Sequence, residues 1–288
     1  MASPRTYALL AYGSWGLLPL FWKLLIAVPA WQILEHRVYW SSLFFFGLFS
    51  YRKVWPELFA CLKQHPILIL ISSFLIGSNW YIYIYAVNAG HILETSLGYF
   101  INPLLSIGLG TVVFREKLSR VQIFSVVLAL IGLGFYAQST AGIPWVAFYL
   151  ALSFSGYGLL RKFLRMSALN AVGLEALILA TVLALGAFIN HSDKPLFPDS
   201  FRLSCLLVLG GLLTAWPLVW FSQAAKVLKL STLGFFQYLS PTLQFLIALF
   251  VFHEPFEKWK LAAFACTWIG IALILVTHAR SPVESNYE

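Results

Sequence analysis

The chain has 288 residues, of which 60% are hydrophobic and only 10% are charged. Soluble domains carry about 25% charged residues, so this composition excludes an ordinary soluble protein and indicates one membrane domain that crosses the bilayer many times. In a soluble protein, the net charge of +8 would suggest an acidic partner, but here the basic residues mark cytoplasmic loops. We therefore expect the lipid bilayer as a partner and no nucleic acid.

The three cysteines, Cys61, Cys205 and Cys266, each lie in or beside an apolar run. They form neither a disulfide framework nor a metal-ligand pattern, so we expect no metal and no cofactor. The first apolar run contains Trp15 and Trp22 and has no small-residue cleavage site. We interpret it as a retained first helix rather than a signal peptide.

Apolar runs of about 20 residues predict ten membrane-spanning helices. In chain order they are expected at Tyr7–Val28, Ala30–Ser50, Pro66–Asn88, Ile92–Phe114, Val121–Gln138, Pro144–Phe163, Ala171–Asn190, Leu203–Ala225, Ser231–Phe252 and Leu261–Thr277. The connections are short, and residues 281–288 are interpreted as a disordered tail. With the N-terminus inside, the inner ends and loops hold 13 Lys and Arg residues and the outer ends hold 6. Because cytoplasmic loops are enriched in these residues, both termini are expected in the cytoplasm.

The two halves of the chain align at an offset of 136 to 140 residues. The aligned pairs are Lys23 with Lys162, Glu35 with Glu175, Trp80 with Trp216, Thr95–Phe100 with Ser231–Phe236, Pro103 with Pro241, and Phe114–Glu116 with Phe252–Glu254. The predicted domains are therefore two five-helix repeats, residues 1–140 and 141–280. Five is an odd number, so the second repeat enters the membrane inverted. Inverted repeats are typical of alternating-access transporters, whose substrate site lies between the repeats near the membrane midplane.

Two polar segments interrupt the apolar runs at corresponding places, Glu94–Leu104 and its weaker copy Ser231–Pro241. Polar groups are costly inside a bilayer, so both segments are expected to face a substrate cavity. Glycine and proline in them suggest that the fourth and ninth spans bend, although a static kink or close helix contact fits the same residues. The residues concerned are Gly98, Pro103, Gly234 and Pro241.

Three runs, Glu35–Ser41, Asn79–Asn88 and Gly90–Leu104, closely resemble the RarD-like branch of the EamA group, within the drug/metabolite transporter superfamily. The resemblance covers nearly the whole chain. It implies an all-α integral membrane fold of ten transmembrane helices in two inverted five-helix repeats, and a location in the bacterial inner membrane. It also implies a small-molecule metabolite as substrate and a central cavity lined by the first, third and fourth helices of each repeat.

Amides and aromatic rings within the spans are the candidates for substrate contact. They are Asn79, Trp80, Tyr83, Tyr99, Asn102, Tyr157, Trp216, Trp220, Gln237 and Tyr238. The amides of Asn79 and Asn102 would orient a zwitterionic or amide-bearing substrate, or else form structural hydrogen bonds between helices. The rings would stack a substrate ring or hold a cation, or else pack against neighbouring helices.

Charged residues near the ends of the spans have two interpretations: snorkelling or paired charges, and gates whose ion pairs close the two mouths alternately. They are Lys23, Glu35, His36, Arg37, Glu94, Arg161, Lys162 and Glu175. Arg37 also suits bidentate binding of a substrate carboxylate. Glu116 and Glu254 are interpreted as solvated helix ends or caps. No carboxylate occupies an obvious midplane position, so coupling to a proton, exchange with a counter-substrate and facilitated transport all stay open.

Two other classes of protein compete with a carrier. An intramembrane prenyl or acyl transferase usually needs clustered acidic residues for a metal-bound diphosphate or a His/Asp pair, but the only Asp residues, Asp193 and Asp199, share one loop. A structural or receptor-like protein does not require inverted repeats. The sequence therefore predicts an inner-membrane carrier for small polar or amphipathic metabolites, with amino acids, related nitrogenous compounds or drugs as candidate cargo. It leaves the oligomeric state open.

Overall fold

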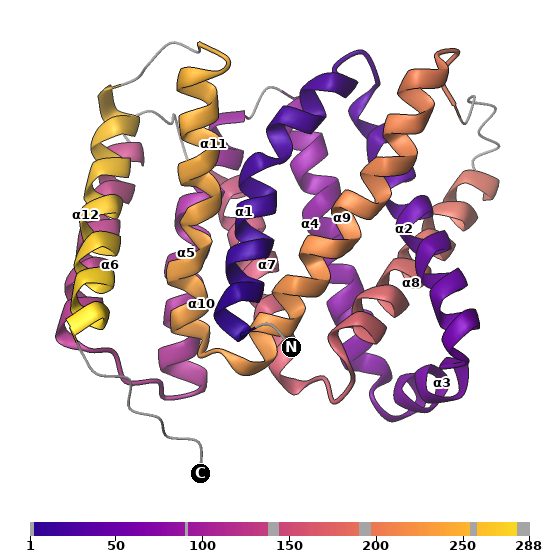
Figure 1. Ribbon diagram of the computed structural model, residues 1–288, viewed down its shortest axis with the longest axis horizontal. Helices are drawn as coiled ribbons and strands as arrows, with labels where there is room; N and C mark the ends of the chain where they lie inside the picture. The colour runs from indigo at the N-terminus through magenta and orange to yellow at the C-terminus, as the bar shows by residue number, and fades with distance from the viewer. Residues whose placement is uncertain (1–2, 90–91, 138–143, 190–196, 254–257, 281–288) are drawn as a thin grey trace.

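The computed structural model describes residues 3–89, 92–137, 144–189, 197–253 and 258–280 (Figure 1). Within these ranges the regular elements are all helices, and no strand occurs. They are α1 Pro4–Trp22, the 3₁₀ helix η1 Lys23–Leu25, α2 Ala30–Arg52, α3 Trp55–Gln64, α4 Pro66–Asn88, α5 Ile92–Val113, α6 Arg120–Ala137, α7 Trp145–Phe163, α8 Ala168–Ile189, α9 Phe201–Val227, α10 Leu230–Gln237, α11 Leu239–Phe250 and α12 Lys258–Arg280. The predicted tail, residues 281–288, lies outside the described residues.

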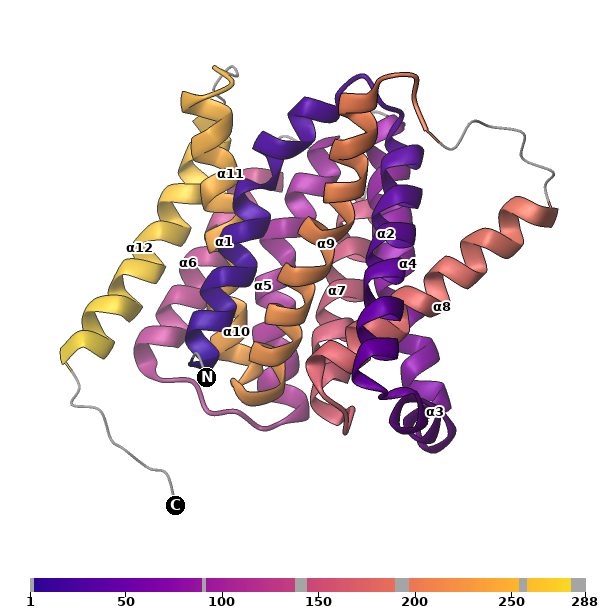
Figure 2. The same cartoon turned by 45° about the vertical axis from the view of Figure 1, so that its right-hand side comes forward.

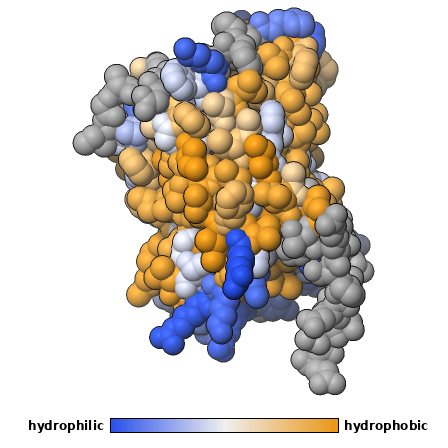
Figure 3. All heavy atoms as spheres, turned by 90° about the vertical axis from the view of Figure 1, so that its left-hand side faces the viewer, coloured by the Kyte–Doolittle hydropathy of each residue, from blue (hydrophilic) through white to orange (hydrophobic). Residues whose placement is uncertain are grey.

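Seven helical segments of the described chain are long and apolar enough to cross a membrane: Pro4–Leu25, Pro66–Ala86, Glu94–Val113, Arg120–Ala137, Ala168–Ile189, Phe201–Val227 and Leu230–Phe250. Helix α2 falls short of that hydropathy because it contains Glu35, His36 and Arg37. On the face shown in Figure 3, hydrophobic side chains form a broad band between two hydrophilic ends. A surface of this kind suits contact with lipid chains in the middle and water at both ends.

The long helices run in alternate directions through the bundle, and α1 begins on the same side as α12 ends (Figures 1 and 2). We call this side, which also carries α3, the terminus side, and the opposite side the far side. Helices α2, α5, α7 and α9 begin on the far side and run toward the terminus side, whereas α1, α4 and α8 run the other way. The position of a residue along its helix therefore shows its depth in the bundle.

Helix α3 occupies a stretch that was predicted only as a connection. It has ten residues, too few to cross a bilayer, and it buries Leu58 while Glu57 stays exposed. Pro56 sits in its first turn, where a missing N–H costs nothing, and Glu57 in the same turn complements the helix dipole. A short amphipathic helix produces no apolar run, which is why a search for membrane spans missed it.

The predicted ninth span is divided into α10 and α11. Pro241 has no backbone N–H, so the carbonyl of Gln237 lacks the donor that a continuous helix would provide. Helix α10 ends at Gln237 and α11 begins at Leu239. In contrast, α5 continues through Pro103 as one helix. The corresponding prolines of the two halves therefore have different effects on their helices.

Gly98 and Gly234 both lie where another helix comes very close. A Cβ atom on Gly234 would lie 2.7 Å from Cγ1 of Ile107 and 2.8 Å from the carbonyl oxygen of Pro103, both in α5. A Cβ atom on Gly98 would lie 3.2 Å from the carbonyl oxygen of Ala147 in α7. Close helix contact, one of the interpretations of these glycines, is therefore present at both, and their role in bending stays a prediction.

One carboxylate joins the loop after α5 to the first turn of α10. The Oε1 atom of Glu116 accepts a hydrogen bond from the backbone N–H of Leu230 at 2.8 Å. The Oε2 atom accepts from the N–H and from the hydroxyl of Ser231, at 2.8 and 2.5 Å. Burial raises the pKa of Glu116, but the hydrogen bonds from Ser231 and Leu230 outweigh it and hold the pKa below its usual value. Glu116 is thus a helix cap; its counterpart Glu254 lies outside the described residues.

We expect Glu116→Gln to lower the free energy of unfolding by about 1 kcal/mol, the typical cost of a lost helix cap. Because folding depresses the pKa of Glu116, its contribution is present above the pKa of the unfolded carboxyl, about 4.3, and is lost as pH falls through the folded-state pKa. Thermal unfolding in detergent at a series of pH values measures this. The wild-type and variant curves should differ near neutral pH and converge in acid. Glu57→Gln in exposed α3 is the control, and an equal effect of both substitutions would contradict the capping role.

Candidate substrate cavity

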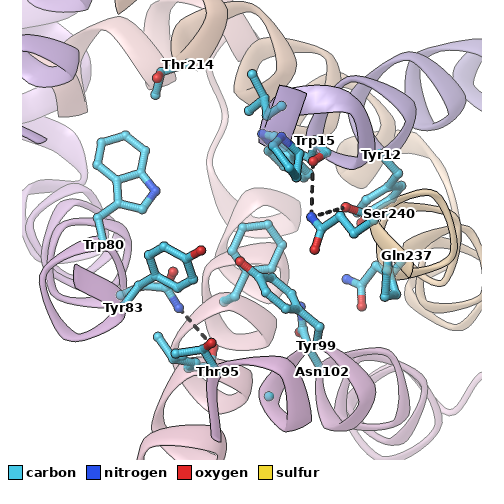
Figure 4. A pocket seen from close by; sticks show the side chains of 18 of the residues that line it. Tyr12, Trp15, Trp80, Tyr83, Thr95, Tyr99, Asn102, Thr214, Gln237 and Ser240 are labelled. Atoms are coloured by element: carbon cyan, nitrogen blue, oxygen red, sulfur yellow. Dashed lines mark hydrogen bonds between the residues drawn. The ribbon is translucent and has the colours of Figure 1, made fainter. Parts of the chain in front are cut away.

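Figure 4 shows a cavity of the bundle, which has a volume of about 190 Å³. The positions of its lining residues along their helices place it from the middle of the bundle toward the far side. Eight helices contribute to its walls: α1, α2, α4, α5, α7, α9, α10 and α11. Trp80 and Tyr83 of α4 lie on one side of it, Tyr12 of α1 and Gln237 of α10 on the other, and Tyr99 of α5 between them (Figure 4). The cavity therefore has walls from both halves of the chain.

Six of the ten residues predicted to contact substrate line this cavity: Asn79, Trp80, Tyr83, Tyr99, Asn102 and Gln237. Gly98 and Pro241 line it as well. Among the charged residues predicted near span ends, only Arg37 belongs to the lining. The structure thus brings together in space predicted residues that are up to 204 positions apart in the chain, from Arg37 to Pro241.

The first helix was expected to line the cavity, but the residues that it contributes were not predicted. Tyr12, Trp15, Pro19 and Trp22 all line the cavity. Their spacing of three, four and three residues places them along one face of α1, and this helical pattern is a signal that the sequence contained. Among the other polar lining residues, Thr95 and Ser240 lie in the two polar segments that were expected to face the cavity. Thr214 and Gln244 were missed, because their local sequences have no distinguishing pattern.

Both predicted amides hold α7 in place at the cavity wall. The Nδ2 group of Asn79 donates to the carbonyl of Leu150 at 3.0 Å and to the hydroxyl of Ser153 at 2.9 Å. The Oδ1 atom of Asn102 accepts from the hydroxyl of Ser155 at 2.6 Å. These are the interhelical hydrogen bonds that were one of the two interpretations. They leave the Nδ2 group of Asn102 available to a ligand, so its role in substrate binding stays a prediction.

A chain of polar groups connects three helices beside the cavity. The Nε2 group of Gln237 in α10 donates to the hydroxyl of Ser106 in α5 at 3.1 Å. The hydroxyl of Ser106 in turn lies 3.3 Å from that of Ser155 in α7. Gln244 of α11 donates to the carbonyl of Trp15 at 3.2 Å, which connects the first and second halves again (Figure 4). These bonds fix the relative positions of the helices that form the cavity.

Arg37 is held at the cavity by one hydrogen bond and two aromatic rings. Its Nε atom donates to Oγ1 of Thr214 at 2.9 Å. Its guanidinium carbon lies 5.1 Å from the ring centroids of both Trp22 and Trp80, within the range of cation–π attraction. Tyr83 and Tyr99 meet edge to face nearby, with ring centroids 6.4 Å apart. The cavity is thus aromatic, and among the described residues Arg37 is the single cationic group in its wall.

Four residues predicted as substrate contacts lie elsewhere. Trp216 is 39% exposed and packs edge to face on Phe44, and Trp220 packs against the hydrophobic core. Tyr238 is buried against Phe100. Tyr157 belongs to a separate polar cluster, described below. Repeat symmetry suggested Trp216 by its alignment with Trp80, but the two tryptophans occupy different environments.

Outside the cavity lining lie the other predicted gating residues of the first half, Lys23, Glu35, His36 and Glu94. Lys23 places its Nζ atom 3.8 Å from the ring centroid of Phe252, just beyond α11. His36 is buried and accepts a hydrogen bond from Nε1 of Trp40 at 3.0 Å, while Glu35 on α2 is half-buried. The carboxylate of Glu94 accepts from the backbone N–H of Val146 in the first turn of α7, at 3.1 Å.

Lys162 and Glu175, both predicted as gating residues, form separate contacts. Glu175 forms its ion pair with Arg161, the neighbouring residue, and both side chains are buried. Lys162 instead donates to the carbonyl oxygen of Leu228 at 2.5 Å and lies 5.3 Å from the ring centroid of Phe114. Adjacent residues on a helix point about 100° apart, so sequence alignment alone does not determine which of them faces α8.

The pair of Arg161 and Glu175 is the centre of a buried cluster. Ser72 of α4 accepts from Nη2 of Arg161 at 2.6 Å and donates to Oε1 of Glu175. Tyr157 donates to Oε2 of Glu175 at 3.1 Å, and its ring lies 4.4 Å from the guanidinium carbon. Arg161 is near the end of α7 and Ser72 near the start of α4, so the cluster lies on the terminus side of the bundle. The cavity and the cluster are therefore at different depths.

We expect Glu175→Gln to lower the free energy of unfolding by roughly 3 to 5 kcal/mol, because it leaves a buried guanidinium without its counter-charge. Replacing both residues, Arg161→Leu with Glu175→Leu, should cost less than the sum of the two single changes. Unfolding in detergent measures this double-mutant cycle. Arg165→Gln, at an exposed site nearby, should have little effect. Additive single effects would show that the pair contributes nothing by its contact.

The fold and cavity define a multi-pass helical membrane protein with a small-molecule cavity between its two halves. In the part of the chain that the structure describes, no three His, Cys, Asp or Glu side chains gather as metal ligands. The EamA-like transporter family model matches residues 5–137 and again residues 141–276. The chain belongs to the EamA-like transporter family.

Several relatives match nearly the full length. The Bacillus subtilis (strain 168) protein named uncharacterized transporter YojE is 42% identical over 95% of this chain and 94% of its own length. Protein RarD of Escherichia coli (strain K12) is 40% identical over 93% of this chain and 92% of its own. A solved crystal structure at 17% identity superposes with a TM-score of 0.76, over 97% of this chain and 99% of the other, which shows the fold alone. The protein is a transporter of the RarD-like branch, with several membrane spans in the bacterial inner membrane.

Proposed function

We propose that the protein carries small polar or amphipathic metabolites across the bacterial inner membrane by alternating access. The proposed architecture has ten membrane-spanning helices in two inverted five-helix repeats, with both termini in the cytoplasm. The observation that carries the proposal is the cavity itself, which takes walls from both halves of the chain and lies toward the far side, while a buried ion pair lies on the terminus side. Such a cavity is the expected substrate site of an inverted-repeat carrier.

Contacts exchanged between the halves support the inverted repeat. Lys23 approaches the ring of Phe252, and its aligned counterpart Lys162 approaches the ring of Phe114, the residue aligned with Phe252. Each lysine thus contacts the other half at an equivalent place. Equivalent helices also pack together: α2 with α8, α5 with α10, and α6 with α12. Arg115 and His253, which are aligned, share a left-handed backbone with φ of 52°.

The contacts on the terminus side act in this proposal as the closed gate. They are the Arg161–Glu175 pair, the bond from Lys162 to Leu228 and the cap that Glu116 forms on α10. All of them connect different helices. Opening toward the cytoplasm requires these contacts to separate while the far side closes over the cavity. The described state then presents its cavity to the outside.

The carrier function predicts substrate flux and a specific effect of Asn102→Ala. A ligand-stability screen of the purified protein identifies binders, and uptake into liposomes tests whether each binder moves. Asn102→Ala should weaken affinity about tenfold, as expected for a lost hydrogen bond. Ser155→Ala is the matched control, because it removes the bond to α7 but keeps the Asn102 amide. Equal affinities for wild-type and Asn102→Ala would exclude that residue from the site, and binders without any flux would contradict the carrier.

The proposed orientation predicts that both ends of the chain are cytoplasmic. Fusions of an alkaline phosphatase and of a fluorescent protein to each terminus in bacterial cells test this, because the phosphatase is active only outside the cytoplasm. We expect fluorescent and phosphatase-negative fusions at both ends. Termini on opposite sides would refute the ten-span topology.

A further inference from the structure

The charge balance of the cavity wall points to the chemistry of the cargo. Among the described residues that line the cavity, Arg37 is the only one with a formal charge. The rest are aromatic, apolar, amide or hydroxyl side chains. No Asp or Glu of the described chain belongs to this lining, so the wall offers a cation and no group that would neutralise it.

Arg37 is positioned so that one edge of its guanidinium group is committed and the other is left to the cavity. The hydroxyl of Thr214 donates to the carbonyl of Gly210 at 2.8 Å, so toward Arg37 it acts as an acceptor. It accepts from Nε of Arg37 at 2.9 Å. The described chain provides no carboxylate within ion-pair distance of Arg37 and no acceptor for its Nη1 and Nη2 groups. Trp22 and Trp80, each 5.1 Å from the guanidinium carbon, restrict its position.

The second arginine within the bundle shows how this protein neutralises a buried guanidinium. Arg161 is fully buried and forms an ion pair with Glu175 of its own chain. Charged side chains inside a membrane are costly and almost always pair with another group. Arg37 meets this requirement only in part, through two indole rings, a threonine and the nearby phenols of Tyr83 and Tyr99, none of which is a carboxylate. The missing counter-charge is the feature of the cavity that calls for a ligand.

We propose that the cargo is an amphipathic organic monoanion, with one carboxylate bound by the Nη1 and Nη2 groups of Arg37 and a planar apolar body against the aromatic wall. The assignment rests on the proposed carrier function and narrows its substrate class. Two parallel N–H donors match the two oxygens of a carboxylate, which makes this contact strong and directional. Asn102 provides a further donor, and the edge-to-face pair of Tyr83 and Tyr99 suits a flat ring. The lining holds no carboxylate for an ammonium group, so a cation of the same shape is disfavoured.

The experiment compares three probes of one shape: indole-3-acetate, indole-3-acetamide and tryptamine. Binding to purified full-length protein in lipid nanodiscs is measured by thermal shift and by calorimetry. The carboxylate should bind about tenfold to a hundredfold more tightly than the amide, and the amine more weakly still. Arg37→Gln should abolish this preference while leaving the weak amide binding in place, and Arg37→Lys should restore part of it.

Two further variants keep the test decisive. Thr214→Val keeps the guanidinium of Arg37 but removes the hydroxyl acceptor that orients it, so carboxylate affinity should fall several-fold. This variant provides a test if Arg37→Gln fails to fold. Arg202→Gln removes an exposed arginine at the far-side end of α9 and should leave the preference unchanged. Equal affinity for carboxylate and amine, or unchanged carboxylate binding in Arg37→Gln, would overturn the inference.

The outcomes separate this inference from the carrier function. Liposome flux of a neutral or cationic compound that is unaffected by Arg37→Gln would overturn the carboxylate assignment and leave the carrier standing. Arg37-dependent binding of the carboxylate without flux of any binder would overturn the carrier function and leave the carboxylate assignment standing.

Discussion

Helix α7 provides the polar partners that neighbouring helices require inside an apolar bundle. The hydroxyl of Ser153 accepts a hydrogen bond from the amide of Asn79 in α4, and the hydroxyl of Ser155 donates one to Asn102 in α5. Arg161 forms an ion pair with a carboxylate of α8. The bilayer core contains no water to satisfy such groups, so each must find its partner on another helix. The positions of α4, α5 and α8 around α7 follow from this requirement. The faces of α4 and α5 beside these bonds are the ones that line the cavity.

The two halves are related in sequence but differ in what they contribute to the cavity. Helix α5 runs unbroken through Pro103, whereas the corresponding span breaks into α10 and α11 before Pro241. The first half provides Arg37 and most of the aromatic rings of the wall, and the second half provides the amides and hydroxyls of α10 and α11. A site with such unequal walls holds a ligand in one orientation, with its charged end toward α2. The asymmetry therefore bears on selectivity, whereas the equivalent contacts of Lys23 and Lys162 belong to the proposed alternating-access mechanism.

Family membership and cavity chemistry answer different questions. The relatives at 40 to 42% identity show that the chain is a membrane transporter, and their names give no cargo. The solved structure with a TM-score of 0.76 adds the fold, at an identity too low to say more. Function resides in sites rather than folds, so the choice of cargo depends on the few side chains that a ligand touches. In this cavity those side chains are one guanidinium without a counter-charge and the aromatic rings around it.

The sequence by itself determined that the chain is helical and membrane-embedded, where most helices lie, and that its family is EamA-like, because apolar runs and family motifs are local properties. Part of the cavity wall was also predictable, since residues such as Asn79 and Asn102 are amides in apolar runs. Only the tertiary structure decided that Trp216 faces away from the cavity, that Glu175 pairs with Arg161, and which polar groups surround the cavity. The reason is physical. The rotation of each helix about its axis is set by packing against helices distant in sequence, and this rotation selects which face meets lipid, protein or ligand.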